Sequence, residues 1–369
     1  MENFDLNSTA AVNFTAEQPT PSTSVYQQAE IVVAGLWPFI ILFGIVANLF
    51  NIIVFLKVGA KDNVTILLVA LSASDLAFLL LITPTVSGHF TYDIVKPSSW
   101  PFQRIILLNL ILYWPAYTAF DLSTYISVSL GVIRCACVAM PLRFKLVFTK
   151  SRTLKWLVFL VFAAVALRIP VLMVNRVAWR TDPVTNITTP YLAMVNRDFL
   201  QKVGDILNRM IMIDVTYITM IACLAILSFK LYQSSKMRRS LALQKPQATD
   251  KTSKKPAGVQ ALSSRDLQVV RSVALVCTIF VIAQLPYVVT TIIRLAFPVS
   301  INEGSLLLFM TFMNVRVNGT CSYLNASVNI FVYYNYNSKY RSVFRSMLRL
   351  SANPKGKDEN LRFSSNQTA

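Results

Sequence analysis

The residues of this chain best placed to do chemistry are polar side chains inside long apolar stretches, and Arg134 is the first of them. It lies in the run 127–139, among leucine, valine, isoleucine and cysteine, shortly before Pro141. An arginine held in the hydrocarbon of a membrane costs roughly 2.5–3.5 kcal/mol, so such a residue usually has a partner or a function. The alternative is a guanidinium that extends to the lipid headgroups. The stretch by itself leaves both interpretations open.

A second group of polar residues could form one polar core. Its members, each in an apolar run, are Asn48, Asp75, Ser123, Asn325 and Asn329. Asn325 and Asn329 are four residues apart and therefore lie on one face of a helix. Carboxylate, hydroxyl and amide oxygens suit a small hard cation or a cluster of water. A hydrogen-bonded seam that fixes helix packing is the alternative.

These polar residues must be positioned by membrane helices. The chain has 369 residues, of which 54% are hydrophobic and only 14% charged. Its apolar stretches are long enough to cross about 30 Å of hydrocarbon. They are expected at about 31–56, 64–88, 105–139, 153–175, 206–232, 267–297 and 305–334. The sequence therefore predicts an all-α integral membrane protein with one seven-helix bundle.

The placement of charge predicts how the bundle sits in the lipid bilayer. The net charge of +18 could indicate a nucleic-acid partner, but the basic residues cluster in short segments on one side of the expected spans. Such clusters face the cytosol, so we expect the N-terminus outside, the tail inside the cell and no nucleic acid bound. Residues 1–30 are expected to be a disordered extracellular segment, 337–350 an amphipathic helix on the inner leaflet, and 351–369 a disordered tail.

Sequons and cysteines fit the same topology. Asn7, Asn13 and Asn186 begin glycan acceptor sequons in segments expected outside the cell. All five cysteines fall inside expected spans, so we predict no extracellular disulfide. The only histidine is His89, and the chain has no HExxH, GxSxG or P-loop motif. We therefore expect no enzymatic activity.

The order of these features resembles the rhodopsin-like (class A) G protein-coupled receptors, over residues 30–350. The motif positions that carry the resemblance are Gly44, Asn48, Leu71, Asp75, Ile133-Arg134-Cys135, Pro141, Phe280, Pro286 and Asn329–Tyr333. Several positions depart from the family pattern: Ile133 replaces the usual acid before Arg134, and Gln284 and Ile330 replace the usual tryptophan and proline. The runs CVAMPLRFK and VNIFVYYNYNSKYRSVFRSM are similar to gastropod chemosensory and neuropeptide receptor branches.

The resemblance implies a seven-transmembrane receptor with an eighth helix, which an extracellular peptide or small chemosensory cue activates. Its partners would be a heterotrimeric G protein, with arrestin and kinases as further candidates. The implied switch comprises Arg134, Asp266, Tyr333, Asn329, Pro286 and Phe280, with Arg134 paired to Asp266 at rest. Asp75 with its polar neighbours would hold sodium. A retinal pigment is not expected, because the last span contains no lysine.

Charged residues at the outer span ends bear on the ligand. The candidate pocket residues are Asp121, Arg209, Gln284, Tyr287, Arg294, Arg316 and Tyr323. The surplus of arginine favours a ligand with a carboxylate or another anion. Alternatively, the arginines pair with headgroups or acids, and Asp121 in particular could pair with Arg168 or Arg209.

Two other functions remain open on the sequence. One is a seven-span transporter or channel, although the chain shows neither internal repeats nor paired broken helices. The other is a decoy receptor that binds without signalling, which the departures at Ile133, Gln284 and Ile330 favour. A G protein activation assay on Arg134→Ala would separate a signalling receptor from a decoy.

Overall fold

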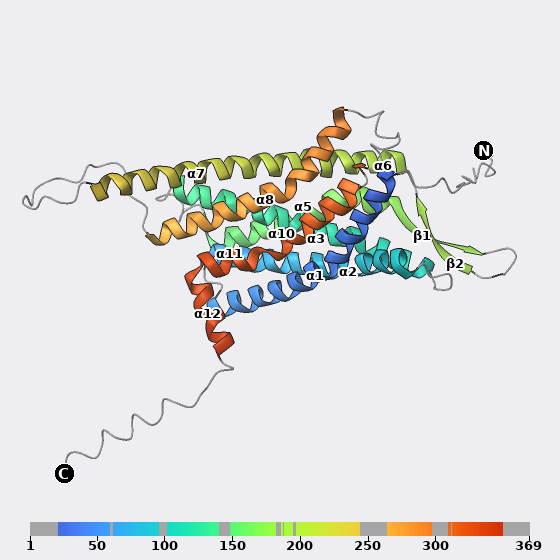
Figure 1. Ribbon diagram of the computed structural model, residues 1–369, viewed down its shortest axis with the longest axis horizontal. Coiled ribbons are helices and arrows are strands. Elements are labelled where there is room, and N and C mark those ends of the chain that lie inside the picture. Colours follow the sequence, from blue (N-terminus) through green and yellow to red (C-terminus); the bar gives the residue numbers. More distant parts are fainter. Residues whose placement is uncertain are drawn as a thin grey trace, which may run out of the picture.

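The computed structural model describes residues 21–59, 62–95, 102–139, 148–181, 186, 188–194, 197–243, 264–296, 309–310 and 312–349. These segments form a bundle of long helices with a β-hairpin at one end and a short helix across the other (Figure 1). We refer to these as the hairpin end, marked by residues 175–194, and the α12 end, marked by residues 338–349.

Within the described residues, six helices are long and apolar enough to cross a membrane. They are α1 (Pro21–Val58), α2 (Asn63–Val95), α3 (Phe102–Ala139), α5 (Lys150–Val174), α7 (Ile213–Leu243) and α8 (Ser264–Ala296). The helix α6 (Arg197–Gly204) and the π-helix η1 (Asp205–Met212) lead into α7. Helices satisfy their own backbone hydrogen bonds, which is why apolar runs of this length become helices in lipid. The prediction of an all-α membrane protein is confirmed.

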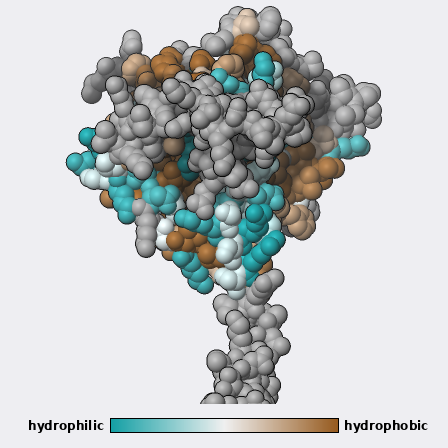
Figure 2. All heavy atoms as spheres, turned by 90° about the vertical axis from the view of Figure 1, so that its left-hand side faces the viewer, coloured by the Kyte–Doolittle hydropathy of each residue, from teal (hydrophilic) through white to brown (hydrophobic). Residues whose placement is uncertain are grey.

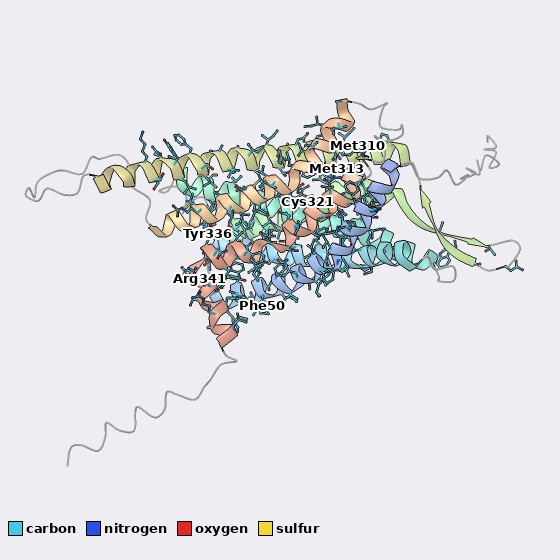
Figure 3. The ribbon with its side chains drawn as sticks, in the orientation of Figure 1. Phe50, Met310, Met313, Cys321, Tyr336 and Arg341 are labelled. Atoms are coloured by element: carbon cyan, nitrogen blue, oxygen red, sulfur yellow. The ribbon has the colours of Figure 1, made fainter. Side chains whose placement is uncertain are left out.

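The last membrane segment is divided into several helical pieces rather than one. The π-helix η3 (Met313–Val317) is followed by α10 (Asn318–Ser327), a turn at Val328 and α11 (Asn329–Tyr336). Figure 3 shows Met313, Cys321 and Tyr336 in succession along this segment. The short helix α12 (Ser338–Arg349) then crosses the end of the bundle (Figure 1).

The outside of the bundle is apolar, as a lipid-facing surface requires. Phe39 is 73% exposed, Phe162 71% and Ile218 65%. In the view of the α12 end, hydrophilic side chains instead gather at the left and in the lower half, and hydrophobic ones lie mainly at the top and at the right (Figure 2). This distribution fits a bundle surrounded by lipid, whose ends meet water.

Several elements differ from the sequence prediction. The helix α1 begins at Pro21, inside the segment expected to be disordered, because proline is favoured in the first helical turn. The helix α7 continues to Leu243, into the expected loop, because no proline occurs before Pro246. The outer loop around Asn186 forms a hairpin.

In that hairpin, β1 (Asn175–Thr181) pairs antiparallel with β2 (Thr188–Met194), and Asn175 lies opposite Met194. Asn186, in the connection, has a φ of 53°, a left-handed conformation that asparagine tolerates better than most residues. The hairpin was not predicted from the sequence, which showed only a loop with a sequon.

Candidate functional site

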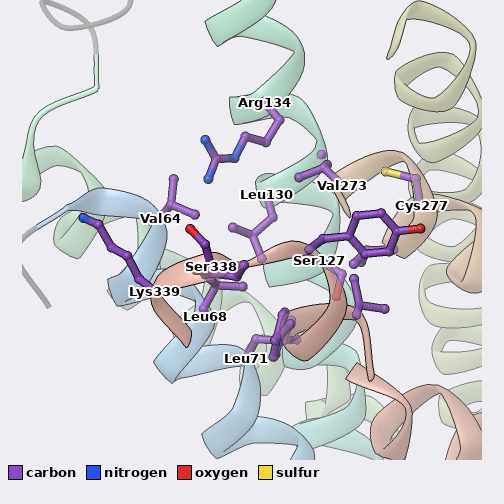
Figure 4. A pocket seen from close by; sticks show the side chains of 16 residues that line it. Val64, Leu68, Leu71, Ser127, Leu130, Arg134, Val273, Cys277, Ser338 and Lys339 are labelled. Carbon is purple, nitrogen blue, oxygen red and sulfur yellow. The ribbon is translucent and has the colours of Figure 1, made fainter. Parts of the chain in front are cut away.

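A cavity of about 260 Å³ opens at the α12 end, between α2, α3, α8, α11 and α12. Its walls are mostly apolar, from residues such as Leu68, Leu130 and Val273, and its charged lining residues are Arg134 and Lys339. Figure 4 shows the Arg134 guanidinium pointing towards the side of the cavity where Val64 and Lys339 lie. The cavity therefore combines an apolar interior with a cationic rim.

Arg134 reaches this cavity from α3. Its Nε is buried and makes no hydrogen bond within the described part of the chain. Ile133, which precedes it, is buried in the hydrophobic core with Leu130, so the adjacent residue supplies no acid to the guanidinium. Asp266 lies in the first turn of α8, but its side chain is outside the described residues, and the predicted Arg134–Asp266 pair stays a prediction.

Tyr333 forms another wall of the cavity. Its ring packs edge-on against Phe55 of α1, with ring centroids 5.0 Å apart, and its buried hydroxyl has no hydrogen-bond partner among the described residues. Nearby, the Tyr340 hydroxyl donates to Oδ1 of Asn51 over 2.7 Å. Burial raises the pKa of Tyr340, which keeps this hydroxyl a donor. This bond ties α12 to α1 beside the cavity.

The predicted polar core is partly assembled in the middle of the bundle. Asp75 of α2 is buried and accepts hydrogen bonds from Ser123 of α3 and from Nδ2 of Asn329 in α11, the latter over 3.0 Å. Asn48 lies elsewhere: its Nδ2 donates to the carbonyls of Gly44 and Ala326 and joins α1 to α10. The structure therefore brings together three of the five predicted members.

The fifth member, Asn325, is half-buried and makes no hydrogen bond to Asp75 in the described part of the chain. The remaining group offers a carboxylate, a hydroxyl and an amide oxygen, which are the ligands that a hard cation takes. The predicted sodium site at Asp75, Ser123 and Asn329 stays a prediction. Such an ion would bridge α2, α3 and α11.

Residues 36–351 match the model of the serpentine-type 7TM GPCR chemoreceptor family Srw. The chain belongs to the Srw family. It is therefore a seven-transmembrane chemoreceptor and a multi-pass membrane protein, whose last membrane segment is the divided one at the C-terminal side. A search of curated proteins finds no match.

The other residues predicted to belong to the switch, Phe280 and Pro286, lie on α8. Phe280 is buried beside Met220 of α7 and Cys277. Pro286 lies inside the helix, where it leaves the carbonyl of Ile282 without its usual helical donor. The proline thus provides a point at which α8 could bend.

Towards the hairpin end, a half-buried arginine and a buried one pair with acids. Arg168 of α5 lies with Nε 2.6 Å from Oδ2 of Asp121 in α3, so one of the two predicted partners of Asp121 is the observed one. Arg316 lies with Nε 3.5 Å from Oε1 of Glu30. Beside the first pair, Nδ2 of Asn208 donates to the carbonyl of Leu167 over 2.8 Å.

The other predicted pocket residues are placed as follows. Gln284 and Tyr323 are buried, and Tyr287 is half-buried. The side chains of Arg209 and Arg294 are outside the described residues, as are Asn7 and Asn13. Asn186 is exposed, as a glycan acceptor must be. All five cysteines are free thiols.

Sequence reasoning missed four residues that shape these sites. Trp37 and Glu30 surround Arg316, and Asn51 and Tyr340 join α1 to α12. A tryptophan close to the outer end of an apolar run was a usable signal for the first pair. The bond between Asn51 and Tyr340 joins residues far apart in the chain, so no local sequence pattern predicts it.

Proposed function

We propose that this Srw receptor converts the binding of an extracellular ligand at the hairpin end into activation of a heterotrimeric G protein at the α12 end. The N-terminus would be outside the cell and α12 on the inner leaflet. The observation that carries the proposal is the cavity at the α12 end, with the guanidinium of Arg134 at its wall and no hydrogen bond to its buried Nε within the described residues. Its family membership supports the same reading.

The chemistry of the cavity fits the end of a partner helix. Leu68, Leu130 and Val273 would pack against apolar side chains of that helix. Arg134 and Lys339 would bind carboxylates or backbone carbonyls at its C-terminus, where the helix dipole is negative. The basic end of α12 would add contacts with the partner.

The movement that widens the cavity would come from α8. Val273 and Cys277 of α8 line the cavity, and Pro286 lies farther along the same helix, towards the hairpin end. A bend at Pro286 would swing the α12 end of α8 away from α3. A ligand that binds the open form more tightly than the closed form would shift the equilibrium by that difference in affinity.

The test is nucleotide exchange on purified Gα subunits, measured with the receptor in lipid nanodiscs. Arg134→Ala is expected to abolish basal and ligand-stimulated exchange. Lys155→Ala is the matched control: Lys155 is basic and exposed in the first turns of α5 but does not line the cavity. Exchange that persists in Arg134→Ala would contradict the proposal.

A decoy that binds without signalling gives a different result. Wild-type protein that binds ligand but promotes exchange on none of the Gα classes would identify the decoy. The orientation is tested separately, by mapping glycans on Asn186 in cells. An unglycosylated Asn186, together with epitope tags showing α12 outside the cell, would overturn the topology.

A further inference from the structure

Arg316 is a buried cation near the hairpin end, and one of its contacts is a long one between its Nε and the carboxylate of Glu30. The Arg316 side chain is 8% exposed, whereas that of Glu30 is 36% exposed, and the two approach no closer than 3.5 Å. Charge-assisted bonds between an N–H group and a carboxylate usually measure 2.7–2.9 Å. Glu30 is therefore the more exposed member of the pair, and its carboxylate forms no tight bond to Nε.

The ion pair of Arg168 and Asp121, also near the hairpin end, is tighter, and its acid is less exposed. Arg168 and Asp121 are joined over 2.6 Å, and their side chains are only 12% and 16% exposed. Asp121 has little access to solvent, so another anion has no route to replace it. At the pair of Arg316 and Glu30, by contrast, another anion can approach from solvent by taking the place of the Glu30 carboxylate.

The guanidinium of Arg316 is held in place by groups other than Glu30. Its Cζ lies 5.1 Å from the centroid of the Trp37 ring, within the range of a cation–π contact. The indole N–H of Trp37 donates to Oγ1 of Thr320 over 2.8 Å, and Thr320 in turn donates to the carbonyl of Arg316 over 2.7 Å. An anchor that is fixed before binding loses little entropy when a ligand arrives.

The backbone at Arg316 is also unusual. Arg316 belongs to the π-helix η3, and such turns occur often at functional sites. Aromatic rings continue from Trp37 into the bundle: Tyr323 meets Trp37 edge-on at 5.5 Å, and Phe78 lies 5.9 Å from Tyr323. The guanidinium thus adjoins a cluster of buried aromatic rings, which gives a ligand bound at Arg316 an apolar neighbourhood.

We propose that Arg316 binds the carboxylate of a ligand with an aromatic or aliphatic body, and that Glu30 is a built-in competitor which this carboxylate displaces. The exchange replaces one carboxylate by another, so Arg316 stays paired and no buried charge is left alone. The inference rests on the proposed function in one respect, namely that the hairpin end faces the outside and receives the ligand.

The experiment measures binding by the thermal unfolding of full-length protein in nanodiscs. The probes are matched pairs of acid and amide: benzoate with benzamide, 3-phenylpropionate with 3-phenylpropanamide, and hexanoate with hexanamide. At least one acid, and none of the amides, is expected to raise the unfolding temperature. In Glu30→Gln the half-saturating concentration of that acid should fall about tenfold, since the competing carboxylate is gone.

Variants of the anchor complete the test. Glu30→Gln combined with Arg316→Gln removes both charges, which protects the fold, and should abolish the response to every acid. Arg345→Gln is the matched control, because Arg345 also stacks on an aromatic ring, 5.8 Å from the centroid of Tyr334, but at the α12 end. It should respond like the wild type.

Several results would overturn the inference. These are equal effects of acid and amide, an unchanged half-saturating concentration in Glu30→Gln, a persistent response in the double variant, and no shift with any acid in either the wild type or Glu30→Gln. The proposed function fails separately: acids that bind through Arg316 without promoting nucleotide exchange would leave the anion site standing and remove G protein activation.

Discussion

Asn329 donates a hydrogen bond from Nδ2 to Oδ2 of Asp75 over 3.0 Å, and this bond joins two helices at the centre of the bundle. Asp75 lies on α2 and Asn329 is the first residue of α11, just after the turn at Val328. Ser123 of α3 donates to the other carboxylate oxygen. A single buried acid therefore links three membrane segments, and its state should influence how they pack.

Asp75→Asn is predicted to remove a stabilising effect of sodium. A cation that binds only the folded protein stabilises it by about 1.4 kcal/mol at a concentration tenfold above its dissociation constant. We expect the wild type to unfold at a higher temperature in sodium chloride than in choline chloride, and Asp75→Asn to unfold alike in both.

Asp62→Asn serves as the control for that experiment. Asp62 is an exposed acid that caps α2 through the backbone N–H and hydroxyl of Thr65, and asparagine caps equally well. This variant should keep the sodium response. A response that survives in Asp75→Asn would refute a sodium site at Asp75.

Two glycines of α1 should differ sharply when replaced by alanine. A Cβ at Gly44 would lie 2.2 Å from Oγ of Ser327 and 2.6 Å from Cδ1 of Leu79, so Gly44→Ala forces these side chains or α1 itself to shift. We expect a loss of roughly 1–3 kcal/mol in the free energy of unfolding. A Cβ at Gly35 meets nothing within 4 Å, and Gly35→Ala should gain roughly 0.5–1 kcal/mol from helix propensity.

Thermal unfolding of both variants in the same detergent is the measurement. Equal stability of Gly44→Ala and Gly35→Ala would contradict the close approach of α1 to Ser327. Because the two changes add the same methyl group to the same helix, their difference isolates packing from propensity.

The sequence predicted the membrane helices and the residues of the polar core better than it predicted the ends of elements. Apolar runs and buried polar residues are local signals, and Asp75, Ser123 and Asn329 stand out in them. Which of those residues meet depends on helix rotation and packing. Asn48 therefore joins the carbonyls of Gly44 and Ala326 instead of Asp75, and nothing in its own run indicates this.

The difference between local sequence signals and packing also explains which predictions at the hairpin end were confirmed and which features were not predicted. That Asp121 would pair with an arginine followed from charge alone, but the choice between Arg168 and Arg209 needed the packing of α3 on α5. The hairpin and the π-turn at Arg316 depend on contacts with the rest of the bundle. Helix propensity carries no information about either.

Tyr340→Phe is predicted to loosen α12. The substitution keeps the ring, which stacks with Phe344 at 5.9 Å, but leaves the buried Oδ1 of Asn51 without its donor. An unsatisfied buried acceptor costs roughly 1–3 kcal/mol. Faster hydrogen–deuterium exchange across residues 338–349 is the expected result.

Tyr334→Phe is the matched control for α12. Its hydroxyl accepts from Nε of Arg345 over 3.2 Å at an exposed position, where the loss should stay within about 0.5 kcal/mol. Exchange in α12 should then match that of the wild type. If Tyr340→Phe and Tyr334→Phe behave alike, the bond to Asn51 does not hold α12.

Replacing only one member of the Asp121–Arg168 pair should lower the free energy of unfolding more than replacing both members. Asp121→Leu leaves a guanidinium unpaired inside the bundle, and loss of one partner of a buried pair typically costs about 3–5 kcal/mol. Combining it with Arg168→Met replaces both charges by apolar side chains and should recover most of that loss. The measurement is the unfolding temperature of Asp121→Leu, of Arg168→Met and of the double variant. If the effects of the two single variants simply add in the double variant, Asp121 and Arg168 do not stabilise each other.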